Sequence, residues 1–226
     1  MCLIVFAWRP GHTTPLVLAA NRDEFYARPC RPLAAWPEAP GVHAGRDPSQ
    51  PRGRRSHGEL PASFCSANCR PKPTWRRWRS GRGTIPASTC WSARPASFWY
   101  YHARETAPRR LPEGLYGLSN AALDTALAKA APRQGGPGRS LERPHADCLL
   151  ATLQDRRPAA DAELPDTGVG LARERLLSSV FIASPDYGTC SSSVLIVAAD
   201  GSRQLVERRL GPGGDPLGKG RLELPP

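Results

Sequence analysis

Two short apolar runs stand near the start of the chain, one on each side of a turn. The runs Leu3–Trp8 and Leu16–Ala20 predict two β-strands, and the turn residues Pro10-Gly11-His12 lie between them. Strands joined by so short a connection pair antiparallel. The pattern therefore predicts a β-hairpin at this end of the chain.

The last third of the chain shows the same pattern. Ser193–Ala198 and Gln204–Arg209 predict two strands, and the Asp200-Gly201 turn between them is a strong hairpin signal. Three shorter segments also predict strands or extended backbone: Phe98–His102, Gly114–Asn120 and Val180–Ala183.

One helix is predicted between these strands. Asp147 is placed to cap it, Leu149, Leu150 and Leu153 recur at helical spacing, and the helix ends before Pro158. Strands at both ends of the chain with a helix between them indicate a mixed α+β layered fold. With 226 residues, the chain is long enough for one domain, residues 1–226, and too short for two ordinary ones.

The positive charge of the chain is concentrated in one segment. The net charge is +11, and residues 49–97, with ten Lys/Arg and one acid, contribute +9 of it. Residues 48–97 show neither a helical nor a strand period, so we expect an aberrant, disordered basic segment inside the domain. Its Trp residues could stack on nucleic-acid bases. An aperiodic insert is poor evidence for an evolved surface, however, and we expect no nucleic-acid partner.

The chain shows no sign of membrane insertion or export. No stretch approaches the roughly 18–20 apolar residues that span a bilayer, and the apolar opening Met1–Trp8 is too short for the core of a signal peptide. We expect no membrane span and a cytoplasmic location. The seven cysteines have no regular spacing, so we expect reduced thiols, Cys148 buried, no metal site and no cofactor.

The first hairpin brings chemically useful residues together. Counted from a centre between Gly11 and His12, Cys2 falls opposite Asn21, with Arg22 and Asp23 beside it. After removal of Met1, Cys2 would carry both a nucleophilic thiol and an α-amine that titrates near pH 8 and can serve as its base. The alternative is structural: a small buried thiol at the start of a strand, with a polar turn and a surface ion pair at the strand end.

Several segments, in order, resemble one known family. The opening Met1-Cys2-Leu3-Ile4 is followed by Leu18-Ala19-Ala20-Asn21-Arg22-Asp23-Glu24-Phe25, and the Asn-Arg-Asp-Glu run gives the NRDE family its name. The similarity continues at these positions: Arg28-Pro29, Trp36, Gly45-Arg46-Asp47, Trp99-Tyr100-Tyr101, Gly114–Asn120, Leu177–Ile182 and Tyr187-Gly188-Thr189. The chain thus resembles the NRDE, or transport and Golgi organisation, family over about two-thirds of its length.

The resemblance implies an αββα sandwich of the N-terminal-nucleophile hydrolase type. By similarity to N-terminal cysteine amidohydrolases, Cys2 attacks an amide carbonyl and Asp23 positions its amine. Asn120 donates a hydrogen bond to the oxyanion or, alternatively, caps a turn. Arg22 completes the candidate catalytic set, although the amidohydrolases space their Arg and Asp differently.

The chain departs from the family pattern in its middle. A hairpin expected after Asp47, which includes an Asn resembling a second oxyanion donor, is absent, and residues from about 65 to 96 resemble a GC-rich gene translated out of frame. Cys190 stands where the family usually has Arg.

The sequence leaves three interpretations of the protein. The first is an N-terminal-cysteine hydrolase of C–N (amide) bonds, impaired in this chain. The second is a non-catalytic binding or trafficking protein for a lipid-like or haem-like ligand, linked to Golgi organisation and protein secretion. The third is a damaged copy with neither activity. The oligomeric state is left open.

Overall fold

The structure of the chain is a computed structural model, and its residues form two compact units. The first unit joins Met1–Cys30 to Glu113–Pro226, and the second is Arg31–Pro112. The structure describes residues 3–28, 32–34, 97–100, 107, 109–118, 123, 141, 144–164, 166 and 168–226, and the backbone alone of residues 89–94 and 101–102. Each unit is described by itself below.

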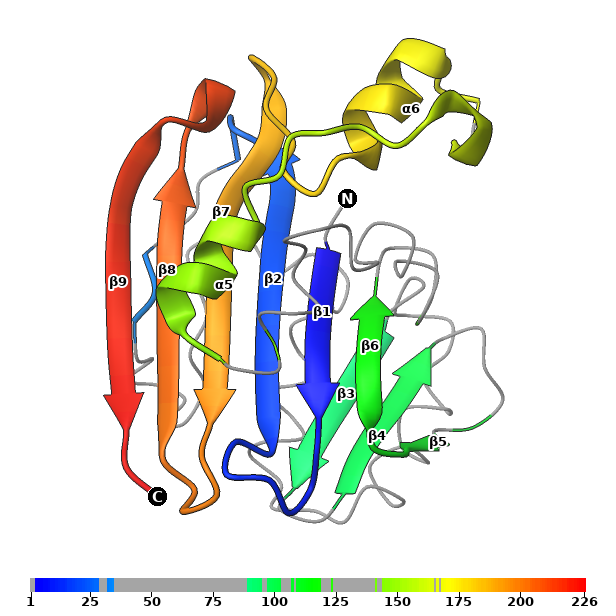
Figure 1. The fold of residues 1–226 in the computed structure, drawn as a ribbon. Helices are drawn as coiled ribbons and strands as arrows, with labels where there is room; N and C mark the ends of the chain where they lie inside the picture. Colours follow the sequence, from blue (N-terminus) through cyan, green and yellow to red (C-terminus); the bar gives the residue numbers. More distant parts are fainter. Residues whose placement is uncertain are drawn as a thin grey trace. The chain divides into compact units, whose positions relative to one another are not determined.

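The first unit is built on a six-stranded antiparallel sheet (Figure 1). Its strand order is β6-β1-β2-β7-β8-β9, so the N-terminal hairpin lies beside the C-terminal meander. The strands are β1 (Leu3–Trp8), β2 (Leu16–Phe25), β6 (Gly114–Leu118), β7 (Tyr187–Val197), β8 (Arg203–Leu210) and β9 (Pro216–Leu224). Both predicted hairpins are confirmed, and β9 is a strand that the sequence pattern missed.

Helix α5 (Ala146–Thr152) packs on one face of this sheet. Leu149, Leu150 and Leu153 are fully buried there, because the helical spacing that predicted the helix places all three on its inner side. They meet the alternate residues of the strands: Leu3, Val5, Ala7, Val17, Ala19, Val194 and Val206. The N-cap is His145, not Asp147 as predicted; Asp147 lies in the first turn.

The segment between the second helix and β7 is not the strand that the sequence predicted. After α6 (Leu171–Ser178), residues 180–182 are buried in irregular backbone, and only Ala183 forms an isolated bridge, with Gly188. Two short 3₁₀ turns, Asp161–Glu163 and Pro212–Gly214, complete the unit.

The second unit contains a three-stranded antiparallel sheet of β3 (Thr89–Arg94), β4 (Ser97–His102) and β5 (Arg109–Leu111). Phe98 and Leu111, paired across β4 and β5, are buried, and Tyr100 lies under the guanidinium of Arg109. The predicted strand at residues 98–102 is confirmed. The disorder was expected over residues 48–97, but residues 89–94 form strand β3 and residue 97 begins β4. Residues 48–88 lie outside the described part of the chain, so the disorder expected there stays a prediction.

Helices and antiparallel sheets together make this an α+β protein. Among the described residues, no helix is both long enough and apolar enough to cross a membrane.

Candidate functional site

The Asn-Arg-Asp-Glu run lies inside strand β2, and strand alternation divides it between the two faces of the sheet. Asn21 and Asp23 are buried on the side of α5, with 1% and 9% of their surface exposed. Arg22 and Glu24 belong to the opposite face and are partly exposed. The run is therefore not the strand-end turn that the structural alternative required.

Two of the four predicted catalytic residues, Arg22 and Asp23, are described by the structure, while Cys2 and Asn120 lie outside the described residues. The predicted register of the first hairpin was wrong by one position: Asn21 pairs with Leu3, not with Cys2. The connection between the strands is centred on His12, with Arg9 N–H bonded to the Pro15 carbonyl, rather than between residues 11 and 12.

Asn21 joins the sheet to the structure that covers it. Its amide nitrogen donates to the backbone carbonyls of Leu153, at 2.8 Å, and Val180, at 2.7 Å. Its amide oxygen accepts the hydroxyl proton of Ser192 on β7, at 2.7 Å. Two carbonyl acceptors fix which end of the amide is nitrogen, so Asn21 holds the end of α5, the 180–182 segment and strand β7 together.

Asp23 lies at an irregularity in the pairing of β2 with β7. Arg22 pairs with Ser191 and Asp23 with Thr189, so Cys190 is the extra residue of a β-bulge. The Thr189 hydroxyl, fully buried, donates to Asp23 Oδ1 at 2.7 Å. The bulge thereby turns a hydroxyl of β7 toward the buried carboxylate.

Tyr26 follows the end of β2 and lies over Gly188. A Cβ atom at Gly188 would overlap the Tyr26 hydroxyl and lie 2.5 Å from the Ile182 carbonyl oxygen, so only glycine fits. The hydroxyl of Tyr26 is buried and has no hydrogen-bond partner among the described residues. Burial raises the pKa of Tyr26 above its ordinary 10.0, and the negative charges of Cys190 and Asp23 raise it further, against the effect of Arg156.

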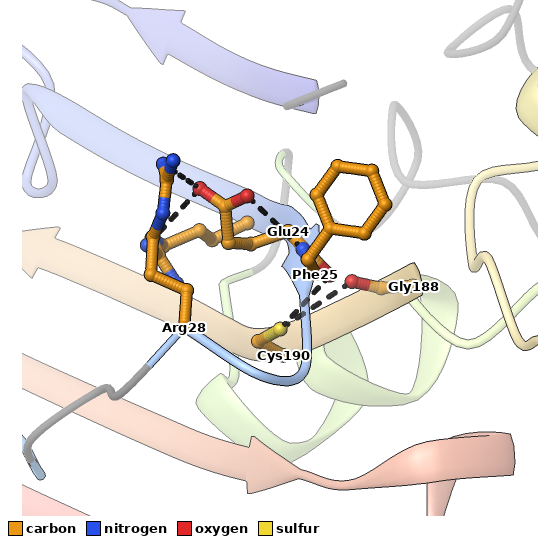
Figure 2. A network of polar contacts seen from close by, with 6 residues as sticks. Glu24, Phe25, Arg28, Gly188 and Cys190 are labelled. Atoms are coloured by element: carbon orange, nitrogen blue, oxygen red, sulfur yellow. Dashed lines mark hydrogen bonds and ion pairs between the residues drawn. The ribbon is translucent and has the colours of Figure 1, made fainter. Parts of the chain in front are cut away.

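The turn that follows β2 carries charged and aromatic residues, among them Glu24, Phe25 and Arg28 (Figure 2). Glu24 accepts from Arg28 at 2.7 Å and lies 3.6 Å from Arg22, and its other oxygen accepts from the Phe25 backbone N–H at 3.0 Å. Glu24 thus closes the turn after β2 and links two arginines.

Two further cysteines are placed by the structure. Cys190 is buried, and its Sγ lies 3.5 Å from the backbone oxygens of both Glu24 and Gly188, as Figure 2 shows. Cys148 is exposed on α5, so the expectation that it is buried was wrong. Helical spacing explains the error, since Cys148 precedes the inward pair Leu149 and Leu150. No group of three or more metal-ligating side chains occurs within the described ranges.

Comparison with known proteins identifies the family to which the chain belongs. The model of the family described as Transport and Golgi organisation 2 matches residues 1–58 and 48–212. This chain belongs to the Transport and Golgi organisation 2 family. The first matched segment contains Asn21 and Asp23, and the second contains Thr189 and Ser192.

Individual Transport and Golgi organisation 2 relatives are similar over nearly the whole chain. The "Transport and Golgi organization protein 2 homolog" of Bos taurus is 30% identical and that of Homo sapiens 27% identical, each alignment covering 93% of both chains. A mouse homologue is 25% identical over the same shares. The bovine alignment spans 264 positions and this chain has only 226 residues, so the relative has residues that this chain lacks.

Sequence reasoning missed the partners that hold the site. It named Asn21 and Asp23 but neither Ser192 nor Tyr26, and it noted Thr189 only as part of a motif. The Tyr187-Gly188-Thr189 motif could have pointed to these partners. Gly188 is required under Tyr26, and the Thr189 hydroxyl donates to the Asp23 carboxylate. Their roles depend on the bulge, which no local pattern predicts.

Proposed function

We propose that this chain is an N-terminal cysteine hydrolase for a C–N (amide) bond, with Cys2 as nucleophile and its α-amine as base. The position of Asp23 carries the proposal. Leu3 pairs with Asn21, and β2 continues through Arg22 and Asp23 beyond that pair. Cys2 is bonded to Leu3, and the proposal requires its α-amine to come within reach of the Asp23 side chain.

The two faces of β2 suggest different roles for the two charged residues. If β1 continues in register by one residue, Cys2 falls opposite Arg22, and its thiol points to the face of Arg22. There a guanidinium favours the thiolate. In the same register the α-amine would continue along the strand axis, where the buried Asp23 carboxylate could hold it as an ammonium ion.

The proposed reaction has two stages, formation of a thioester on Cys2 and its hydrolysis. The thiol proton passes to the α-amine, sulfur bonds to the amide carbonyl carbon, and the C–N bond breaks as the leaving amine takes that proton. Water then cleaves the thioester and releases the acid. Asn120 is the proposed donor to the oxyanion. The missing hairpin removes a second donor, whose loss typically costs about 10²–10³ in rate, so turnover is expected to be weak.

A second candidate is a non-catalytic binding or trafficking protein with a small amide, lipid-like or haem-like ligand. The contacts of Asn21 favour this second candidate, because both amide hydrogens and the amide oxygen of its side chain are used to join structural elements. One of the family's namesake residues therefore maintains the fold. The names of the relatives, which refer to transport and Golgi organisation, agree with such a role.

A hydrolysis assay separates the two candidates. Acyl-amide substrates are incubated with this chain, with Cys2→Ala, and with a version in which the family's missing hairpin is restored. The covalent state of Cys2 is followed by mass spectrometry. We expect an acyl adduct on Cys2 in the first chain, absent in Cys2→Ala, and faster turnover after repair. A repaired chain with no adduct and no turnover would favour the binding protein.

A further inference from the structure

Thr189 holds the backbone of Ile182 from both sides. Its backbone N–H donates to the Ile182 carbonyl at 2.8 Å, and its hydroxyl accepts from the Ile182 N–H at 3.0 Å. Thr189 is fully buried, so water does not compete for either bond. The position of the hydroxyl oxygen is therefore fixed by the 180–182 segment.

This clamp also fixes the direction of the hydroxyl proton. A threonine hydroxyl has one proton to donate. Because the Ile182 N–H already points at the oxygen, the proton is directed away from it, to Asp23 Oδ1 at 2.7 Å. A donor of fixed direction holds a carboxylate in one rotamer and favours its ionised form.

We infer that Thr189 is the positioning residue for Asp23: its hydroxyl fixes the carboxylate to which the proposed function assigns the α-amine of Cys2. The inference rests on the proposed function and adds to it. The reactivity of the thiol then depends on the buried 180–182 segment, which sets the Thr189 hydroxyl. Asp23, Cys190 and Arg156 all act electrostatically on Tyr26, and Arg22 and Glu24 lie next to Asp23 on β2.

Strand β7 provides a matched control for this role. Ser192 is another fully buried hydroxyl three residues further along, and it also donates over 2.7 Å, but to Asn21. Removing the Ser192 hydroxyl deletes one buried hydrogen bond, and removing the Thr189 hydroxyl deletes two, the one to Asp23 and the one from the Ile182 N–H. A general loss of stability is therefore expected from both changes, and a larger one at Thr189. Of these two hydroxyls, that of Thr189 donates to the Asp23 carboxylate and that of Ser192 donates to the Asn21 amide.

The test is the rate of Cys2 alkylation by iodoacetamide between pH 6 and 10, mapped by mass spectrometry on full-length chains shown to be folded by circular dichroism. Five variants are compared with the parent chain: Asp23→Ala, Thr189→Val, Thr189→Ser, Ser192→Ala, and the double change of Asp23→Ala with Thr189→Val. Hydrogen bonds to charged groups are among the strong ones, so a loss of roughly tenfold near pH 7 is expected in Thr189→Val.

We expect Asp23→Ala and Thr189→Val to be slow near pH 7, the double variant to be no slower than Asp23→Ala, and Thr189→Ser and Ser192→Ala to match the parent. At pH 10 all rates converge, because the thiolate is then formed without help. A slow Asp23→Ala beside a normal Thr189→Val overturns the role of Thr189 and leaves the proposed function standing. A normal Asp23→Ala overturns both.

Discussion

Ser192 donates its hydroxyl proton to the side-chain oxygen of Asn21 across the β2–β7 pair, at 2.7 Å. The same amide donates to the carbonyls of Leu153 and Val180, so one side chain connects strand β7, the end of α5 and the 180–182 segment. The first residue of the Asn-Arg-Asp-Glu run is thus fully used in holding the fold.

Asn21→Ala is therefore expected to destabilise the chain strongly. It leaves two carbonyls and one hydroxyl without their partner, and each buried unsatisfied group costs about 1–3 kcal/mol. We expect a loss of roughly 3 kcal/mol or more in urea unfolding. Ser192→Ala, which removes one bond only, is expected to lose about 1 kcal/mol. An Asn21→Ala chain as stable as Ser192→Ala would contradict the joining role of Asn21.

Gly188→Ala is expected to be destabilising by steric overlap. The added Cβ would overlap the Tyr26 hydroxyl and lie 2.5 Å from the Ile182 carbonyl oxygen. Forcing extra atoms into packed sites typically costs about 1–3 kcal/mol. Combining it with Tyr26→Phe should recover only part of this loss, because the backbone oxygen remains. The midpoint of thermal unfolding checks this, and full recovery in the double variant would show that the backbone contact is unimportant.

The raised pKa of Tyr26 predicts how the stability of the chain changes at alkaline pH. Its pKa is raised in the folded chain, mainly by burial, so the unfolded chain loses the phenolic proton first. This contribution to stability is complete below about pH 10 and is lost as the pH rises through the folded pKa. Tyr26→Phe should therefore lose less stability between pH 9 and 11 than the parent chain. Urea unfolding at several pH values measures the difference, and parallel curves would contradict it.

Tyr26→Phe should also be tolerated at neutral pH. The hydroxyl is buried without a partner among the described residues, so removing it leaves no broken hydrogen bond. We expect no loss of stability at pH 7 and a gain of up to about 1 kcal/mol. A loss above 1 kcal/mol in urea unfolding at this pH would mean that the hydroxyl has a partner.

The two described cysteines should differ in reactivity under native conditions. Cys148 is exposed on α5, whereas Cys190 is buried in the bulge beside Asp23. Because alkylation needs an accessible thiolate, Cys148 should react faster than Cys190 by at least about tenfold. Peptide mapping after timed iodoacetamide treatment gives both rates, and unfolding in urea should abolish the difference. Equal native rates would show that the bulge opens readily.

The local sequence pattern predicted the strands and the helix better than it predicted the contacts between them. Short apolar runs beside turn residues predicted β1, which is buried over nearly all of its length, and the hairpin of β7 with β8. The pattern missed β9 (Pro216–Leu224), where a proline, two glycines and charged residues mask an edge strand. Residues 180–182 resemble a strand because they are apolar, yet they are buried as irregular backbone.

The candidate site was only partly accessible to sequence reasoning. Counting from the turn brought the N-terminal strand to the Asn21–Asp23 segment, but the seven-residue connection Arg9–Pro15 moved the register by one position. The bond from Thr189 to Asp23 joins residues 166 positions apart through a bulge. Such a contact depends on tertiary structure, and no short window of the sequence contains it.

The most direct test of the central claim is the alkylation rate of Cys2 relative to exposed Cys148 at pH 7, in the parent chain and in Asp23→Ala. Cys148, which is exposed on α5, is the internal reference. If the Asp23 carboxylate holds the α-amine of Cys2 as an ammonium ion, Cys2 reacts at least about tenfold faster than Cys148 in the parent chain, and Asp23→Ala removes most of that advantage. A Cys2 that reacts no faster than Cys148, or one whose rate is unchanged in Asp23→Ala, would contradict the claim.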